Sequence, residues 1–268
     1  MVSKTAVVDG ITMRWEEQGE GMPVILVHGI PTCPALWRHV MPLIAGVRCL
    51  AWEMVGYGAS IPEGVGRDIS VAQQANYLVR WLRHLGIDKA VLAGHDLGGG
   101  VVQIAAVRNR DLCSGLFLTN AIGYDSWPIP SVKAMRATGP ALRHLPNLAF
   151  KQIFRTFLQR GHDDSSRARD ALEAHWPHYE RHGGAEDFVR QVSALDVQDT
   201  LAVAGDLPSL DIPARIAWGE ADRFQKIEYG ERFARDLKAP LRGIEGGKHF
   251  TPEDHPEVVA QEIIALLG

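Results

Sequence analysis

One turn in the chain constrains the fold more than any other feature. The motif Gly94-x-Asp96-x-Gly98 joins a short apolar run, residues 90–93, to a stretch that predicts a helix as far as about residue 108. A strand, a sharp glycine-rich turn and a helix, in that order, form the context in which an α/β sheet presents a nucleophile. The glycines leave room where a Cβ would clash. The motif therefore predicts that Asp96 is a nucleophile at the end of a buried strand.

The chain around this turn alternates short apolar runs with longer amphipathic stretches. Such alternation predicts an α/β fold in which a mostly parallel central sheet is flanked by helices. Asp9-Gly10 lies between two apolar runs and predicts a hairpin, and Ser70 is expected to cap a helix. Strands are expected at residues 7–8, 11–15, 24–27, 48–52, 90–93, 115–119, 214–218 and 241–244, and further helices at 71–85, 228–237 and 257–267.

The alternation stops after Gly123. An insertion of this length is usually functional and often forms a lid. We therefore expect an α/β core of residues 1–123 and 207–268 that carries an inserted helical cap, residues 124–206. Prolines are expected to break the helices of this cap at Pro128, Pro130, Pro140, Pro146 and Pro177.

Aromatic residues are frequent in the predicted cap. Phe150, Phe154 and Phe157 recur at helical spacing, which predicts a cap face packed on the core and a possible wall for an apolar pocket. For Trp127 and Trp176, core packing is favoured over ligand contact.

Composition narrows the classes of partner. The net charge is −4 and no long basic run is present, which argues against a nucleic-acid partner. The three cysteines are odd in number and not closely spaced, which argues against a disulfide framework and a zinc site, so we expect a reduced, cytoplasmic setting. No apolar run approaches the roughly 18 residues that a membrane span needs. We expect no metal, no organic cofactor and no membrane partner, and a monomer or a homodimer.

A carboxylate nucleophile limits the chemistry. Asp96 would lie at a helix N-terminus, where free N–H groups favour its ionised form, although Asp is also a common helix cap. Attack on an ester carbonyl would give an unfavourable mixed anhydride, whereas attack on an sp³ carbon gives an ordinary ester that water can hydrolyse. The expected substrate is a small apolar molecule with an electrophilic carbon, in an epoxide or bearing a halide, and water is the co-substrate.

Two further side chains complete a candidate triad. His249 follows the last expected strand and would activate water against the ester, and Asp222 follows the strand at 214–218 and would orient the imidazole. The chain order nucleophile, acid, histidine is the order of this type of site. His255 is the competing histidine, and Glu220 is expected to face away.

An oxyanion hole is the remaining requirement. His28-Gly29-Ile30-Pro31 follows an early strand, where the second donor of such a hole is expected. The donors would be the backbone N–H groups of Ile30 and Leu97. His28 itself is interpreted as a structural loop residue.

With these residues placed, the chain resembles the Asp-nucleophile branch of the α/β-hydrolase superfamily, which contains haloalkane dehalogenases and epoxide hydrolases. The resemblance covers nearly the whole chain outside the cap and implies the α/β-hydrolase fold. The motifs that carry it are His28-Gly29-Ile30-Pro31-Thr32, Gly56-Tyr57-Gly58-Ala59-Ser60, Gly94-His95-Asp96-Leu97-Gly98-Gly99 and the pair Asp222 and His249.

Departures from the family pattern bear on the leaving group. Similar dehalogenases place Trp after the nucleophile and many place Asn in the early motif, where this chain has Leu97 and Ile30. A missing donor to a developing anion costs about 3 kcal/mol, by analogy with oxyanion holes. The Pro31-Thr32 motif, the Leu36-Trp37-Arg38 motif and Asn120-Ala121 are nevertheless dehalogenase-like. The arginines that fluoroacetate dehalogenases place beside the nucleophile are absent, because those positions are Leu97 and Gly100.

The resemblance to epoxide hydrolases implies a donor in the cap that protonates the ring oxygen. Tyr179 and Tyr124 are the candidates, although Tyr179 also fits an ordinary helix surface. The favoured function is a hydrolase that opens an epoxide to a diol through an ester on Asp96. The alternatives are a haloalkane dehalogenase, another hydrolase such as one acting on esters, and a ligand-binding protein with weak catalysis.

Overall fold

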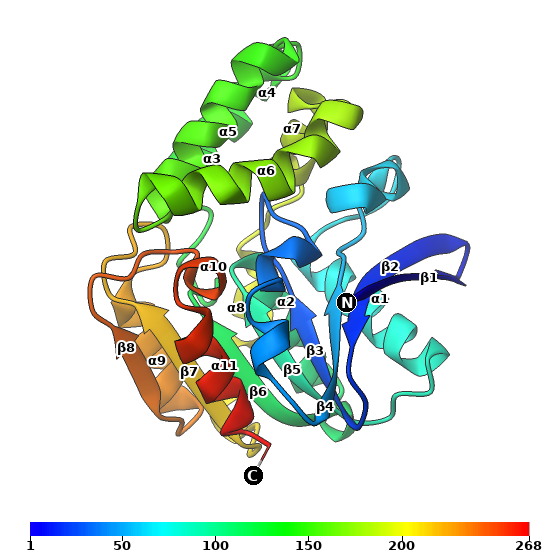
Figure 1. Ribbon diagram of the computed structural model, residues 1–268, viewed down its shortest axis with the longest axis vertical. Helices are drawn as coiled ribbons and strands as arrows, with labels where there is room; N and C mark the ends of the chain where they lie inside the picture. Colours follow the sequence, from blue (N-terminus) through cyan, green and yellow to red (C-terminus); the bar gives the residue numbers. More distant parts are fainter. Residues whose placement is uncertain (268) are drawn as a thin grey trace.

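A single sheet of eight strands runs through the protein: β1 (Val2–Val8), β2 (Ile11–Gln18), β3 (Met22–Val27), β4 (Val47–Trp52), β5 (Ala90–His95), β6 (Cys113–Thr119), β7 (Ala214–Gly219) and β8 (Leu241–Ile244). The computed structural model, which describes residues 1–267, orders them β1-β2-β4-β3-β5-β6-β7-β8 (Figure 1). β1 and β4 flank β2 in antiparallel fashion, and all later neighbours pair in parallel. The expected α/β class and mostly parallel sheet are confirmed.

The N-terminal hairpin forms where Asp9-Gly10 predicted it. Val8 pairs with Ile11, and the turn residues Asp9 and Gly10 have φ angles of 50° and 75°. Positive φ at both positions matches the right-handed twist of the strands, and Asp and Gly tolerate it. Both strands are longer than the apolar runs suggested, because their backbone pairing continues past those runs.

Helices cover both faces of the sheet. They are α1 (Val71–His84), α2 (Leu97–Arg108), α8 (Gln198–Ala204), α9 (Ile227–Asp236), α10 (Thr251–Asp254) and α11 (Pro256–Ile264), with 3-10 turns η1 (Pro34–Trp37), η2 (Met41–Leu43), η3 (Gly58–Gly64), η4 (Arg110–Leu112) and η5 (Leu207–Ser209). In Figure 1, α11 lies in front of the strands, and α1, α2 and α8 contact one another on the opposite face. The predicted N-cap residue of helix α1, Ser70, is confirmed, because Gln73 N donates to Ser70 Oγ at 3.3 Å.

Five helices lie above the sheet and form the cap (Figure 1): α3 (Pro130–Ala137), α4 (Gly139–Leu142), α5 (Asn147–Gly161), α6 (Ser165–Arg181) and α7 (Ala185–Ser193). Aromatic rings hold them together. Phe150 lies 5.4 Å from Phe188 between ring centroids, and Phe154 lies 5.1 Å from Tyr179 and 5.6 Å from Trp176. Phe150 and Phe154 therefore pack within the cap and not on the core, contrary to the prediction. Phe157 does pack on the core, because its ring stacks on Phe224 at 4.8 Å between centroids.

Two predictions for the inserted segment need correction. Residues 124–206 were expected to be cap throughout, but α8 packs against α1 and α2 and so belongs to the core layer. Pro177 was expected to break a helix, but it lies inside α6. The buried rings of Trp176 and Tyr179 on either side of it pack into the cap, which offsets the hydrogen bond that proline cannot donate.

No helix within residues 1–267 is both long and apolar enough to cross a membrane.

Candidate active site

Asp96 occupies a strained turn between β5 and α2. Its φ and ψ are 49° and −121°, a conformation that non-glycine residues rarely adopt and that is often found at functional sites. Glycines make the turn possible: a Cβ on Gly98 would lie 2.1 Å from the carbonyl oxygen of Val27, and one on Gly94 2.4 Å from that of Gly98. Asp96 holds the N-cap position of α2, yet its side chain makes no capping hydrogen bond. The structure therefore gives no support to the helix-cap interpretation.

The Asp96 carboxylate faces the two expected oxyanion donors. Ile30 N lies 3.4 Å from Asp96 Oδ2, and a Cβ on Gly29 would lie 2.4 Å from Asp96 Cβ, so only glycine fits beside the carboxylate. Burial raises the pKa of Asp96, while the charge on His249 and the N–H groups of Leu97 and Ile30 oppose that rise. Both donors thus lie where the carbonyl oxygen of an Asp96 ester would form.

His249 lies between Asp96 and Asp222. Its Nδ1 is 2.8 Å from Asp222 Oδ2, and its Nε2 is 3.8 Å from Asp96 Oδ1. Burial alone would lower the pKa of His249, but the charge and hydrogen bond of Asp222 and the charge of Asp96 raise it. The structure therefore brings together the three side chains that the sequence predicted to form a triad.

Asn120 holds Asp222, the acid of the candidate triad, in position. It follows β6 with a φ of 42°, and its Nδ2 donates to Asp222 Oδ2 at 2.7 Å while its Oδ1 accepts from Gly219 N at 3.1 Å. Phe224 N donates to the other oxygen of Asp222 at 2.6 Å. Sequence reasoning noted Asn120 only as part of a resemblance and missed this role. The available signal was a polar residue directly after the strand that neighbours β7.

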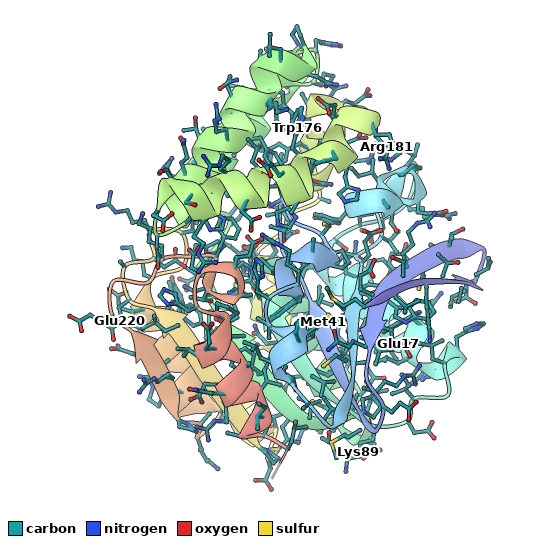
Figure 2. The ribbon with its side chains drawn as sticks, in the orientation of Figure 1. Glu17, Met41, Lys89, Trp176, Arg181 and Glu220 are labelled. Carbon is teal, nitrogen blue, oxygen red and sulfur yellow. The ribbon has the colours of Figure 1, made fainter. Side chains whose placement is uncertain are left out.

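The competing residues have other partners. His28 Nε2 accepts from Met54 N at 3.2 Å, and burial lowers the pKa of His28 to about 3, which fits a neutral structural residue. His255 Nε2 lies 2.6 Å from Asp163 Oδ2. Glu220 is exposed at the margin of the molecule (Figure 2), as expected.

The two predicted cap donors do not lie at the site. Tyr179 donates its hydroxyl to Gln191 Oε1 at 2.6 Å inside the cap. Tyr124 donates to Asp236 Oδ2 at 2.8 Å, and the Arg232 guanidinium lies 3.7 Å from the centroid of its ring. Neither tyrosine lines the cavity at Asp96. Both hydroxyls are committed to partners elsewhere in the fold.

A small cavity opens at Asp96 and His249. Apolar side chains from core and cap line it, including Ile122, Trp127, Ile129, Val132, Phe157 and Phe224. Trp127 is buried in the hydrophobic core as expected, and it also lines the cavity while its Nε1 donates to Thr200 Oγ1 at 2.7 Å. Trp176 packs among the cap side chains as expected (Figure 2).

Gln225 is a polar residue of the cavity wall that sequence reasoning missed. It is 3% exposed, and its Oε1 accepts no hydrogen bond from any described residue. Its backbone oxygen accepts from Trp218 Nε1 at 2.9 Å, which holds the segment in place. A buried amide with an unpaired oxygen beside a cavity is poised for a ligand, because leaving such a group unpaired costs about 1–3 kcal/mol.

Comparison with known proteins places this geometry in a family. Residues 22–256 match the model of the alpha/beta hydrolase fold family. The chain belongs to that family. It is 27% identical to haloalkane dehalogenase 2 of Mycobacterium tuberculosis over 96% of this chain and 91% of that one. It is 29% identical to a soluble epoxide hydrolase of a Corynebacterium species, over 95% and 93% of the two chains.

Solved structures agree on the fold. An alpha/beta hydrolase fold protein from Burkholderia ambifaria superposes with a TM-score of 0.91 at 24% identity, covering 98% of this chain and 97% of that one. The family and these relatives support a hydrolase as the coarse function. Within residues 1–267, no group of three or more His, Cys, Asp or Glu side chains is arranged to hold a metal ion.

Proposed function

We propose that this protein is a hydrolase whose nucleophile is the Asp96 carboxylate and whose first candidate substrate is an epoxide, opened to a diol. The observation that carries the proposal is a carboxylate at the strand–helix turn with His249 Nε2 3.8 Å away. A carboxylate forms a stable ester only at an sp³ carbon with a leaving group. The similarity to a haloalkane dehalogenase and to an epoxide hydrolase supports this chemistry. The apolar cavity suits a small apolar substrate.

The first step forms the ester. An Asp96 oxygen attacks a ring carbon, the C–O bond breaks, and its electron pair goes to the ring oxygen. Displacement at carbon is in line, so the oxygen departs on the side of the carbon away from Asp96. His249 lies beside Asp96 and is badly placed to protonate that oxygen. The proton must come from another wall of the site.

Tyr57 does not line the cavity either, but unlike the two cap tyrosines its hydroxyl is uncommitted, and it is our candidate for that donor. Of the five tyrosines, all within the described residues, the other four donate their hydroxyls to protein acceptors, and Tyr57 donates to none. Its side chain is 1% exposed and its ring packs edge-on against His28. Burial and the charge of Asp96 raise the pKa of Tyr57, so its hydroxyl carries a proton in the resting protein.

The second step returns the enzyme to its starting state. Neutral His249 removes a proton from water as the water attacks the ester carbonyl of Asp96. Ile30 N–H and Leu97 N–H stabilise the oxyanion, and Asp222 stabilises the imidazolium. Collapse of the intermediate releases the diol, whose oxygen takes a proton from His249. The second proton of the water, left on the Asp96 carboxyl, passes to the Tyr57 oxygen, so that Asp96 is again ionised and Tyr57 again protonated. Water is therefore consumed as a co-substrate.

Dehalogenation is the second candidate, and Gln225 favours it. Halide release needs N–H donors, and the family's usual side chains are replaced by Leu97 and Ile30. The Gln225 amide in the cavity wall supplies an uncommitted N–H group, since no described residue accepts a hydrogen bond from it.

A trapping experiment tests the proposal. The variant His249→Gln is incubated with separate panels of epoxides and haloalkanes, and peptide mass spectrometry searches for an ester on Asp96. Without the base the ester is expected to accumulate. A hydroxyalkyl adduct identifies an epoxide hydrolase and a plain alkyl adduct a dehalogenase. The matched control is His84→Gln at an exposed histidine, which is expected to turn over normally.

Three further variants sharpen the outcome. Asp96→Ala in the His249→Gln background is expected to remove every adduct, and normal turnover by Asp96→Ala alone contradicts the proposal. Tyr57→Phe is expected to slow alkylation by epoxides and leave alkylation by haloalkanes unchanged, and Gln225→Leu to do the reverse. Multiple turnover of esters without any adduct would instead identify an ester hydrolase. Tight retention of an unmodified ligand without turnover would identify a binding protein.

A further inference from the structure

The loop that carries His249 is bound to a turn of the cap. We call residues 248–255, which include the short helix α10, the histidine loop. We call residues 161–163, from the last residue of α5 towards α6, the cap turn. The carbonyl oxygen of Gly161 accepts from both His249 N, at 2.9 Å, and Phe250 N, at 3.2 Å. A Cβ on Gly161 would lie 2.5 Å from the Phe250 ring, so only glycine permits this approach. The backbone of the candidate base is thus held directly by the cap.

His162 lies at the centre of this contact. Its side chain is fully buried and its ring stacks on Phe250 at 4.5 Å between centroids. Nδ1 lies 2.8 Å from Asp254 Oδ1, and Nε2 lies 3.3 Å from Glu253 Oε2. Burial by itself would lower the pKa of His162, but the hydrogen bonds and charges of Asp254 and Glu253 raise it to about 9. A buried imidazole with a raised pKa therefore joins the cap to two carboxylates of α10.

Glu253 extends the contact to other elements. Its Oε1 lies 3.1 Å from His175 Nε2 on cap helix α6, and it forms an ion pair with Arg38, which follows η1 in the core. Arg38 is also paired with Asp170 on α6. Glu253 is 1% exposed, so its charge depends on these partners. One carboxylate thus binds the cap at two histidines and the core at one arginine.

Asp163 binds both ends of the histidine loop. Its Oδ1 accepts from Lys248 N at 2.8 Å, and its Oδ2 lies 2.6 Å from His255 Nε2. Lys248 Nζ in turn donates to the carbonyl oxygen of His162 at 2.6 Å. On the core side, the carbonyl oxygen of His249 lies 2.9 Å from His95 Nε2, and Thr251 Oγ1 lies 2.6 Å from Thr119 Oγ1 and donates to Asn120 Oδ1 at 3.1 Å. The loop is therefore held from both sides, by the core at Thr251 and His249 and by the cap turn at its two ends.

We propose that His162 is a positioning residue for the base, and that the cap turn is required for hydrolysis of the Asp96 ester but not for its formation. The inference rests on the proposed function. Formation of the ester uses Asp96, which is fixed by the glycines of the core. Hydrolysis uses His249, whose backbone N–H is held by the cap turn as well as by contacts with the core. A displacement of about 1 Å in such a group costs about 100-fold in rate.

The test separates the two steps in His162→Gln, which keeps a side chain of similar size but carries no positive charge. The substrate is an epoxide or haloalkane that forms the ester in His249→Gln. Rapid-quench mass spectrometry then follows the ester on Asp96 in each protein. Formation is expected at the wild-type rate and hydrolysis about 10- to 100-fold more slowly, so that the ester accumulates. Equal slowing of both steps, or of neither, overturns the inference.

A pH profile adds a readout that lost packing alone would not move. Wild-type ester hydrolysis is expected to fall as pH rises through about 9, because His162 then loses its charge. That limb is expected to be absent in His162→Gln. The other groups facing His162 are Glu253 and Asp254 on α10, with Lys248 and His249 on the loop. Asp254→Asn removes one partner and is expected to reproduce the slower hydrolysis, which provides a second variant should His162→Gln not fold.

Hydrogen exchange tests the inference without any substrate. The amides of His249 and Phe250 are expected to exchange faster in His162→Gln, while the amides of β5 and α2 around Asp96 keep their protection. Unchanged exchange at His249 overturns the inference even where the ester forms. Failure of the wild-type protein and of His249→Gln to form any ester would refute the proposed function, and the exchange result would still decide whether His162 holds the loop.

Discussion

The core and the cap of this protein are held in place by different means. In the core, the position of Asp96 is set by backbone against backbone: Gly94 and Gly98 approach neighbouring carbonyl oxygens more closely than any Cβ allows. In the cap, helices α5, α6 and α7 are held by rings such as Phe150, Trp176 and Phe188. The backbone contacts admit one residue type, whereas ring packing admits many. The turn that carries Asp96 therefore tolerates little change in sequence, whereas the cap side of the cavity wall tolerates more.

The largest expected effect tests the rigidity of the core. Gly98→Ala places a Cβ 2.1 Å from the carbonyl oxygen of Val27, and neither backbone can move without breaking β3 or α2. We expect a loss of about 3 kcal/mol or more in the free energy of unfolding, measured by urea denaturation. Gly205→Ala is the matched control, since a Cβ there meets nothing within 4 Å. Equal stability of the two variants would contradict the comparison.

Removal of a ring tests the cap. Phe150 is 1% exposed and contacts Phe154, Trp176, Tyr179 and Phe188. Phe150→Ala is expected to cost about 3 kcal/mol through the lost burial and the cavity left behind. Hydrogen exchange is expected to rise in α5 to α7 and to stay unchanged in β3, β5 and β6. Equal loosening of the sheet would show that cap and core unfold as one unit.

The pH dependence of ester hydrolysis tests the electrostatics of the core site. Asp222 and Asp96 raise the pKa of His249 above its ordinary value of 6.5. The base acts only when neutral, so the rate is expected to fall about tenfold per pH unit below that raised pKa. The raised pKa also stabilises the fold at low pH, and this contribution is lost as pH rises through it. Asp222→Asn is expected to move the acid limb of the rate profile to lower pH.

The smallest expected effect concerns the sequence-predicted donor at the entrance to the cap. Tyr124→Phe removes the hydrogen bond to Asp236 and leaves the ring stacked on Tyr229 in place. Thermal unfolding is expected to show a loss of about 1 kcal/mol in stability. Ester formation on Asp96 is expected to be unchanged. A large loss of alkylation rate would instead show that Tyr124 reaches the substrate and that the cap moves during the reaction.

Sequence alone predicted much of the core. The triad candidates Asp96, Asp222 and His249 were found because each follows an expected strand. Parallel strands bring their carboxyl ends to one edge of the sheet, so residues after these strands lie close together. The cap was predicted only as a helical insertion. Its aromatic spacing indicated a buried face but not what that face contacts, and its boundary was placed beyond α8. Tyr179 was a candidate donor by residue type, and its true partner, Gln191, lies on a different helix.

The sequence alone predicts the local backbone conformation at two places, the glycine-rich turn that carries Asp96 and the hairpin at Asp9-Gly10. These features are local, so a few neighbouring residues specify them. Tertiary structure alone decided which polar groups remain free. Within residues 1–267, the hydroxyl of Tyr57 and the side-chain oxygen of Gln225 have no hydrogen-bond partner. The pKa of His162 is raised by Glu253 and Asp254, which lie far away along the chain. Hydrogen-bond satisfaction depends on three-dimensional neighbours, and no local pattern encodes it.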